Sequence, residues 1–228
     1  MFKGFTQETI DFFLQLGFNN YKSFFEENRQ QYYEKVRNPF YAFIESLAPT
    51  MLQIDPQIEV RPHKCLARIH RDTRFSKDKS PYRDHLWVLF KQQNEARRDS
   101  LMFWFELSPR MIAWGMGFWG RSSKQMEAMR KKLREKPDAF LRGILDSQLQ
   151  KHQMGLSGEE YKRIIVPDNL PLGLHEWYRK KEVYIQKIQP NYAKAITEEL
   201  VPTIASDFLS LQPLYQMLRE VVEERKTI

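Results

Sequence analysis

The chain has 228 residues, of which 42% are hydrophobic and 14% aromatic, and its formal net charge is +7. This composition supports a packed core and excludes an intrinsically disordered protein. The single cysteine, Cys65, excludes an intrachain disulfide and a metal site built from several thiolates, so we expect a cytoplasmic protein.

The N-terminus lacks the continuous apolar stretch of a secretory signal. The longest strongly apolar run, MIAWGMGFWG, is about half the length that a membrane-spanning helix needs. We therefore expect a soluble protein with no membrane partner.

Residues 1–60 carry patterns that are typical of helices. A short helix through TQETIDFFLQL is followed by a longer one for which Asn20 is the candidate N-cap. Pro39 lies inside the longer stretch and predicts a kink or a division of the helix. Pro49 is expected to begin an irregular approach to the next segment.

From residue 65 to residue 119 the pattern changes to about four strand-like runs: CLARIHR, HLWVLFK, SLMFWFEL and MIAWGMGFW. The links between them are short and lack helical periodicity, which predicts an antiparallel meander and argues against a parallel sheet. Residues 122–228 return to mainly helical patterns. The sequence therefore predicts a single α+β domain over residues 1–228, in which an antiparallel sheet within 61–121 packs against N- and C-terminal helices.

The positive charge is concentrated in one segment. Between residues 61 and 83 there are eight Lys or Arg against two Asp, a local net charge of +6. Such a concentration attracts anions, whereas an evenly basic surface would mainly aid solubility. The alternative is a solvated hairpin loop whose charges bind nothing in particular.

Two strings in the sequence imitate nucleotide-binding motifs. His70-Arg71-Asp72 matches the start of a kinase catalytic loop, and GMGFWG fits G-x-G-x-x-G. Lys77 occupies the position of the magnesium-binding Asn, however, and the glycine string follows the HRD string instead of preceding it. A dinucleotide-binding turn is also disfavoured, because Phe118 and Trp119 stand where small residues are needed. We expect the glycines to lie in an aromatic strand and leave room for bulky neighbours.

The histidines show no metal-binding spacing. His70, Asp72 and His85 could meet across a hairpin, but histidines at strand ends more often bond to backbone or solvent. We therefore expect no metal site, and the residues leave the cofactor open.

Several segments resemble the conserved-hypothetical family called domain of unknown function 2461. They are FNNYKSFFEENRQQYYEKVRNPF, RIHRDTRFSKDKSPYRDH, ELSPRMIAWGMGFW and YKRIIVPDNLPLGLHEWYRKKEVYI. One departure is Phe24, where the family often has Trp, which affects packing and not chemistry. The resemblance implies a single α+β domain and a shared site, but no established activity or cofactor. The motif positions are occupied here by Asn28, Arg29, Arg68, Arg71, Asp72, Arg74, Phe75, Ser76, Lys77, Pro81 and Tyr82.

We therefore expect a binding site for a phosphorylated or carboxylated small molecule at the exit of the first strand. Guanidinium groups hold such anions in bidentate fashion, and ammonium groups act as point charges. Its expected residues are Arg68, Arg71, Asp72, Arg74, Ser76, Lys77, Lys79 and Tyr82, with Asn28 and Arg29 from the long N-terminal helix.

Two other functions compete with this one. Nucleic acid could bind the same basic face, with Phe75 and Tyr82 stacking on bases. Alternatively, a hydrolase or transferase could use Asp72 or His70 as a base on an anionic substrate, although neighbouring arginines should lower the pKa of Asp72 and favour an orienting role. The sequence leaves open whether the chain is an enzyme and in what oligomeric state it exists.

Overall fold

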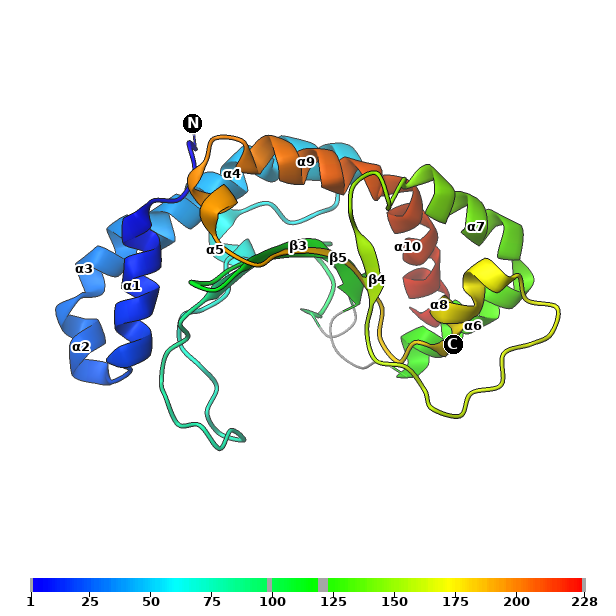
Figure 1. Cartoon of the computed structure of the whole chain (residues 1–228), viewed down its shortest axis with the longest axis horizontal. Coiled ribbons are helices and arrows are strands. Elements are labelled where there is room, and N and C mark those ends of the chain that lie inside the picture. The colour runs from blue at the N-terminus through cyan, green and yellow to red at the C-terminus, as the bar shows by residue number, and fades with distance from the viewer. Residues whose placement is uncertain (1, 98–99, 119–122, 227–228) are drawn as a thin grey trace. The chain divides into compact units, whose positions relative to one another are not determined.

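The computed structural model describes residues 2–97, 100–118 and 123–226 (Figure 1). The fold is α+β with an antiparallel sheet, as predicted. The chain forms two compact units. The first contains Met1–Phe90, Trp104–Trp114 and Ile188–Ala205, and the second contains Lys91–Phe103, Gly115–Lys187 and Ser206–Ile228. The organisation as one domain stays a prediction.

The five strands have the order β1-β2-β3-β5-β4. They are β1 (Leu86–Lys91), β2 (Leu101–Leu107), β3 (Ile112–Phe118), β4 (Gly155–Ser157) and β5 (Tyr184–Gln189). The last two lie in the region that we predicted to be mainly helical, and the sequence analysis did not identify them as strands. The alternation around β5, with Val183 and Ile185 buried, is too short to stand out beside the charged, helix-like HEWYRKKE.

The predicted strand at residues 65–71 was also wrong. Pro62–Cys65 form a short helix, α5, and the residues after it contribute only isolated bridges at Leu66 and His70. The backbone is extended there, but its partner cannot form a continuous ladder, because Pro81 lacks an N–H and the chain bends at residues 84–85.

The N-terminal helices are α1 (Gln7–Phe18), α2 (Lys22–Glu27), α3 (Arg29–Tyr32), the π-helical turn η1 (Tyr33–Arg37) and α4 (Asn38–Ile54). Asn20 does not cap α2, because Tyr21 holds that position. Pro39 does divide the long helical stretch, as predicted, whereas Pro49 lies inside α4 and not in an irregular segment.

The division at Pro39 has a specific compensation. Proline has no N–H, so it cannot donate to the carbonyl of Lys35 four residues earlier. The buried hydroxyl of Thr9 in α1 donates to that carbonyl at 2.6 Å instead. A polar contact from α1 therefore accommodates the break that Pro39 causes and fixes α1 against η1.

The core of the first unit is aromatic. The ring centroid of Phe5 lies 4.7 Å from that of Phe40 and 5.6 Å from that of Phe43. The ring centroids of Phe43 and of Phe105 in β2 are 4.5 Å apart. These rings fix the N-terminal helices to the strands of this unit.

The C-terminal elements begin with α6 (Ser123–Glu135) and α7 (Pro137–Asp146). They continue with η3 (Leu172–Leu174), α8 (His175–Arg179), η4 (Ala193–Ile196), α9 (Leu200–Ser210) and α10 (Gln212–Lys226). In the second unit, α10 packs on α6 and α7, and Phe103 packs on Phe208 and Tyr215. No helix in the described part of the chain has the length and apolar character to span a membrane.

Gly115 and Gly117 lie in β3, as predicted, but their role differs from the one expected. They admit the backbone of the neighbouring strand and not bulky side chains. A Cβ on Gly115 would lie 2.1 Å from the carbonyl oxygen of Ile185, and one on Gly117 would lie 2.4 Å from that of Val183. Trp119 and Gly120, the end of the GMGFWG string, lie outside the described residues.

Gly115→Ala should therefore destabilise the second unit, because the clash is with backbone that cannot rotate away. We expect the free energy of unfolding to fall by about 3 kcal/mol, measured by urea denaturation. Gly155→Ala in β4 is the matched control, since its Cβ would meet nothing within 4 Å. Equal losses in the two variants would contradict this explanation.

Candidate anion-binding cavity

The basic segment forms a narrow excursion that leaves and rejoins the first unit ahead of β1 (Figure 1). The Arg71 N–H donates to the Pro81 carbonyl at 2.8 Å, and the Arg83 N–H donates to the Ile69 carbonyl at 2.9 Å. Residues 69–71 and 81–83 are thereby paired, and residues 72–80 form the loop between them.

Asn20 anchors this hairpin to the turn between α1 and α2. Its amide nitrogen donates to the Tyr82 carbonyl at 3.0 Å, and its amide oxygen accepts from the Tyr82 N–H at 2.9 Å. The Tyr82 side chain is 3% exposed and stacks on Phe25 with ring centroids 4.3 Å apart. One residue of the hairpin is thus held at both its backbone and its ring.

Because the Tyr82 side chain faces inward, alternation along the extended chain places the side chains of Arg83, His85 and Trp87 on the opposite face of the chain. These three side chains are half-buried, whereas Leu86 is fully buried. The guanidinium carbon of Arg83 lies 4.8 Å from the centre of the Trp87 ring, and the His85 ring meets the same indole edge-on at 4.6 Å. The three residues form one contiguous cluster.

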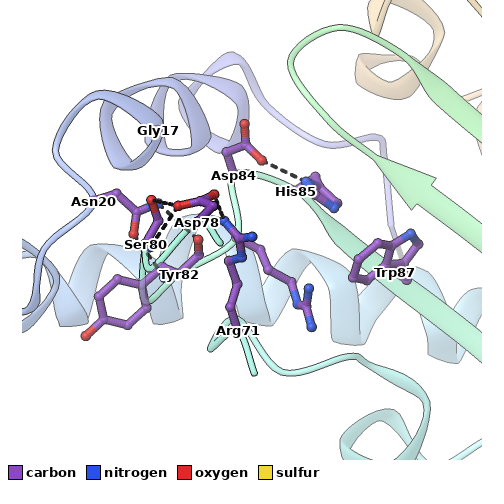
Figure 2. A pocket seen from close by; sticks show the side chains of 10 residues that line it. Gly17, Asn20, Arg71, Asp78, Ser80, Tyr82, Asp84, His85 and Trp87 are labelled. Carbon is purple, nitrogen blue, oxygen red and sulfur yellow. Dashed lines mark hydrogen bonds and ion pairs between the residues drawn. The ribbon is translucent and has the colours of Figure 1, made fainter. Parts of the chain in front are cut away.

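A cavity of about 390 Å³ lies beside this cluster, within the first unit (Figure 2). Its wall is formed by residues from the end of α1, the following turn, the hairpin and the start of β1. They are Gly17, Asn20, Arg71, Asp78, Ser80, Tyr82, Arg83, Asp84, His85 and Trp87.

One of its two arginines is already paired. Arg71 forms an ion pair with Asp78, whose other oxygen accepts from the Ser80 N–H at 2.9 Å and from the Ser80 hydroxyl at 2.7 Å. The bonds from Ser80, and then the one from Arg71, hold the pKa of Asp78 well below its usual range. The Arg71 guanidinium, 27% exposed, is therefore fixed in orientation.

Arg83 differs from Arg71 in having no countercharge. Within the described residues no carboxylate pairs with it, and its buried Nε–H has no hydrogen-bond acceptor. Burial, and then the like charge of Arg71, lowers the pKa of Arg83. Its positive charge is consequently the uncompensated one in the cavity wall.

His85 is the histidine of the wall. Its Nδ1 lies 2.7 Å from the Oδ1 of Asp84, and the two side chains are 27% and 47% exposed. Figure 2 shows the contact between these two side chains.

The structure brings only part of the predicted site to the cavity. Arg71 and Tyr82 belong to its wall, although Figure 2 shows the Tyr82 ring directed away from Arg71. The buried ring also has no free face for stacking on a base. Arg68 and Lys77 are exposed and Ser76 is half-buried, and none of the three is a wall residue of the described cavity.

The loop charges are largely paired with each other. Asp72 accepts from Nε and Nη2 of Arg74 at 2.9 and 2.6 Å, and this lowers the pKa of Asp72 to about 2, as predicted in direction. A carboxylate that stays ionised and bonded is poorly suited to act as a general base near neutral pH. Lys79 donates to the Thr73 carbonyl at 2.9 Å and closes the loop.

Asn28 and Arg29 lie at the junction of α2 and α3 and are not wall residues of the described cavity. The Asn28 amide donates to the Phe24 carbonyl at 2.9 Å at the end of α2. Arg29 contacts Tyr33 and Glu26, each at 3.3 Å. These contacts stabilise the local helices. The possible metal site of His70, Asp72 and His85 has no counterpart, since the described residues contain no suitable group of three ligands.

The sequence prediction missed Asn20, Arg83, His85 and Trp87 as wall residues. A usable signal was present, because Arg83, His85 and Trp87 alternate with the apolar Leu86 and Val88. Asn20 gave no such signal, since its partner is 62 residues away.

Replacing Asn20 tests whether it positions the hairpin. Asn20→Ala leaves the Tyr82 N–H and carbonyl without their partners, so the free energy of unfolding should fall by about 2 kcal/mol in urea denaturation. Asn19→Ala, which removes exposed contacts in the same turn, should cost less than about 1 kcal/mol. A loss at Asn20 no larger than that at Asn19 would show that the anchor is dispensable.

Comparison with known proteins agrees with the sequence motifs. No curated protein matches the chain. The profile of the family described as "Conserved hypothetical protein (DUF2461)" matches residues 8–217, which include the hairpin, the cavity wall and most of both units. The chain is therefore a member of this conserved-hypothetical family, DUF2461.

Proposed function

We propose that the protein binds a small phosphorylated or carboxylated molecule in the cavity beside Arg71 and Arg83. The observation that carries this proposal is the half-buried guanidinium of Arg83, which has no carboxylate partner among the described residues and lies close to a second positive charge. An anionic group between the two arginines would relieve their repulsion and supply the missing acceptor.

The wall is organised for recognition before a ligand arrives. Trp87 supports the Arg83 guanidinium, and Asp78 fixes that of Arg71. Side chains that are already held in place lose little conformational entropy on binding. The cavity volume of about 390 Å³ exceeds that of a simple ion and falls in the range of small-molecule sites. The ligand should therefore carry a body as well as an anionic group.

The wall also contains the carboxylates of Asp78 and Asp84. A purely anionic ligand would be repelled by them, whereas hydroxyl or amino groups on the ligand could donate to them. The exposed Arg68 and Lys77 would act outside the cavity by attracting anions toward it. We also place the protein in the cytoplasm, in keeping with a lone cysteine that is buried.

Ligand binding is tested by thermal unfolding and calorimetry with inorganic phosphate, glycerol phosphate and citrate. At least one of them should raise the melting temperature at millimolar concentration. Arg83→Gln should weaken its binding by about tenfold or more, because a charge-assisted hydrogen bond contributes about 1.5–3 kcal/mol.

Arg74→Gln is the matched control, because Arg74 belongs to the same hairpin, is 77% exposed and pairs with Asp72 outside the wall. The affinity of the Arg74→Gln variant for the same anion should stay within about threefold of that of the unmodified protein. Unchanged melting with every anion, or equal weakening in the two variants, would refute the proposal.

Nucleic-acid binding is the second candidate, favoured by Phe75 at the loop. Its ring is 95% exposed, and the Arg74 guanidinium lies 5.8 Å from its centre. An exposed aromatic ring beside cations is the arrangement that stacks on unpaired bases.

This candidate predicts that a single-stranded oligonucleotide binds with an affinity that falls steeply with salt, as measured by fluorescence anisotropy. Phe75→Ala should weaken binding by about 1–3 kcal/mol, whereas Arg83→Gln should have a smaller effect. Absence of binding at low salt would eliminate this function and leave the small-molecule proposal untouched.

A further inference from the structure

The Asp84–His85 pair gives the cavity a group that anion binding alone does not require. Asp84 accepts at 2.7 Å from Nδ1 of His85 when that nitrogen carries the proton. This bond selects the tautomer in which Nε2 has a free lone pair. His85 is thus oriented as a base in the wall that also contains two arginines.

The histidine is fixed from a second side. Its ring meets Trp87 edge-on at 4.6 Å, and Trp87 in turn supports Arg83. His85 and Arg83 therefore contact the same indole from neighbouring positions on one face of the chain. A phosphoryl group held by Arg83 would lie next to the imidazole.

We propose that the cavity hydrolyses a phosphate ester, with His85 as general base, Asp84 as the residue that positions it, and Arg83 and Arg71 as the groups that hold the phosphoryl oxygens. This inference rests on the proposed function, because it requires that the anion be bound in the cavity.

The reaction needs only water as the second reactant. Nε2 of His85 takes a proton from water while the water oxygen forms a bond to phosphorus. The ester P–O bond on the opposite face of phosphorus breaks, the leaving alkoxide takes a proton from solvent water, and His85 returns its own proton to solvent. The products are an alcohol and phosphate, or a phosphate monoester if the substrate is a diester. The two guanidinium groups balance the negative charge on the phosphoryl oxygens.

A second His–Asp pair in the chain has the same separation but does not line the described cavity. His152 and Asp207 are also 2.7 Å apart, but Lys187 forms an ion pair with the same Asp207 at 3.4 Å. Asp207 is 5% exposed, and neither residue belongs to the wall of the described cavity. That pair has the contacts of a buried structural cluster, whereas His85 lies beside an uncompensated cation.

The test uses the whole chain with p-nitrophenyl phosphate and bis(p-nitrophenyl) phosphate as probes, from pH 5 to pH 9. The protein should release p-nitrophenol from at least one of them. His85→Gln should lower kcat by about 100-fold or more with KM changed by less than about threefold. The acidic limb of the pH profile, which requires a neutral imidazole, should disappear with it.

Asp84→Asn is the second variant, and it leaves the imidazole in place. It should lower kcat by about tenfold or more and change KM by less than about threefold. His63→Gln is the matched control, because His63 is exposed on α5 and is not a wall residue of the described cavity. It should retain full activity, and all variants are purified in the same way to detect a contaminating phosphatase.

The outcomes separate this inference from the function on which it rests. If phosphate raises the melting temperature but neither probe is hydrolysed, catalysis is refuted and anion binding stands. If His85→Gln keeps the activity, His85 is not the base. If none of phosphate, glycerol phosphate and citrate raises the melting temperature and neither probe is hydrolysed, both proposals fail. Should His85→Gln not fold, the split between kcat and KM in Asp84→Asn decides.

Discussion

The hydrogen-bonded pair between Asn20 and the backbone of Tyr82 is the contact on which the cavity depends. It joins the turn after α1 to a hairpin 62 residues away and satisfies both polar groups of one backbone residue. Since side chains alternate along an extended chain, fixing Tyr82 inward also decides the direction of Arg83. A slip of one residue would bury a guanidinium and expose a tyrosine, so the register and the site are determined together.

The carboxylates of the hairpin then divide its arginines into two groups. Asp72 pairs with Arg74 and Asp78 pairs with Arg71, so the loop is ordered by its own charges. Arg83 receives no such partner among the described residues and is held by the Trp87 ring instead. The segment that carried a net charge of +6 in the sequence therefore presents to the cavity one charge that is both fixed and unbalanced.

The sequence predicted the α+β class and the antiparallel sheet, and it singled out the basic segment that supplies part of the described cavity wall, because these follow from local periodicity and local charge. It did not predict which members of that segment meet. Tyr82 was expected to be available to a base, but its ring is covered by Phe25, a contact between residues far apart in the chain. His85 and Trp87 were missed for a simpler reason: they carry no excess charge, and only their alternation with Leu86 and Val88 marks them.

The arrangement at Arg83 is unfavourable for stability when the cavity holds no anion. A half-buried guanidinium loses hydration, and the nearby charge of Arg71 adds repulsion, which together lower the pKa of Arg83. Arg71 and Arg74 in the same hairpin each pair with an aspartate. The hairpin can therefore present a carboxylate to an arginine, but it presents none to Arg83 among the described residues. An arginine without a countercharge beside contacts that are otherwise well paired is the reason that we propose a binding site here. In that proposal, the missing aspartate partner of Arg83 is replaced by the phosphoryl or carboxylate group of the ligand.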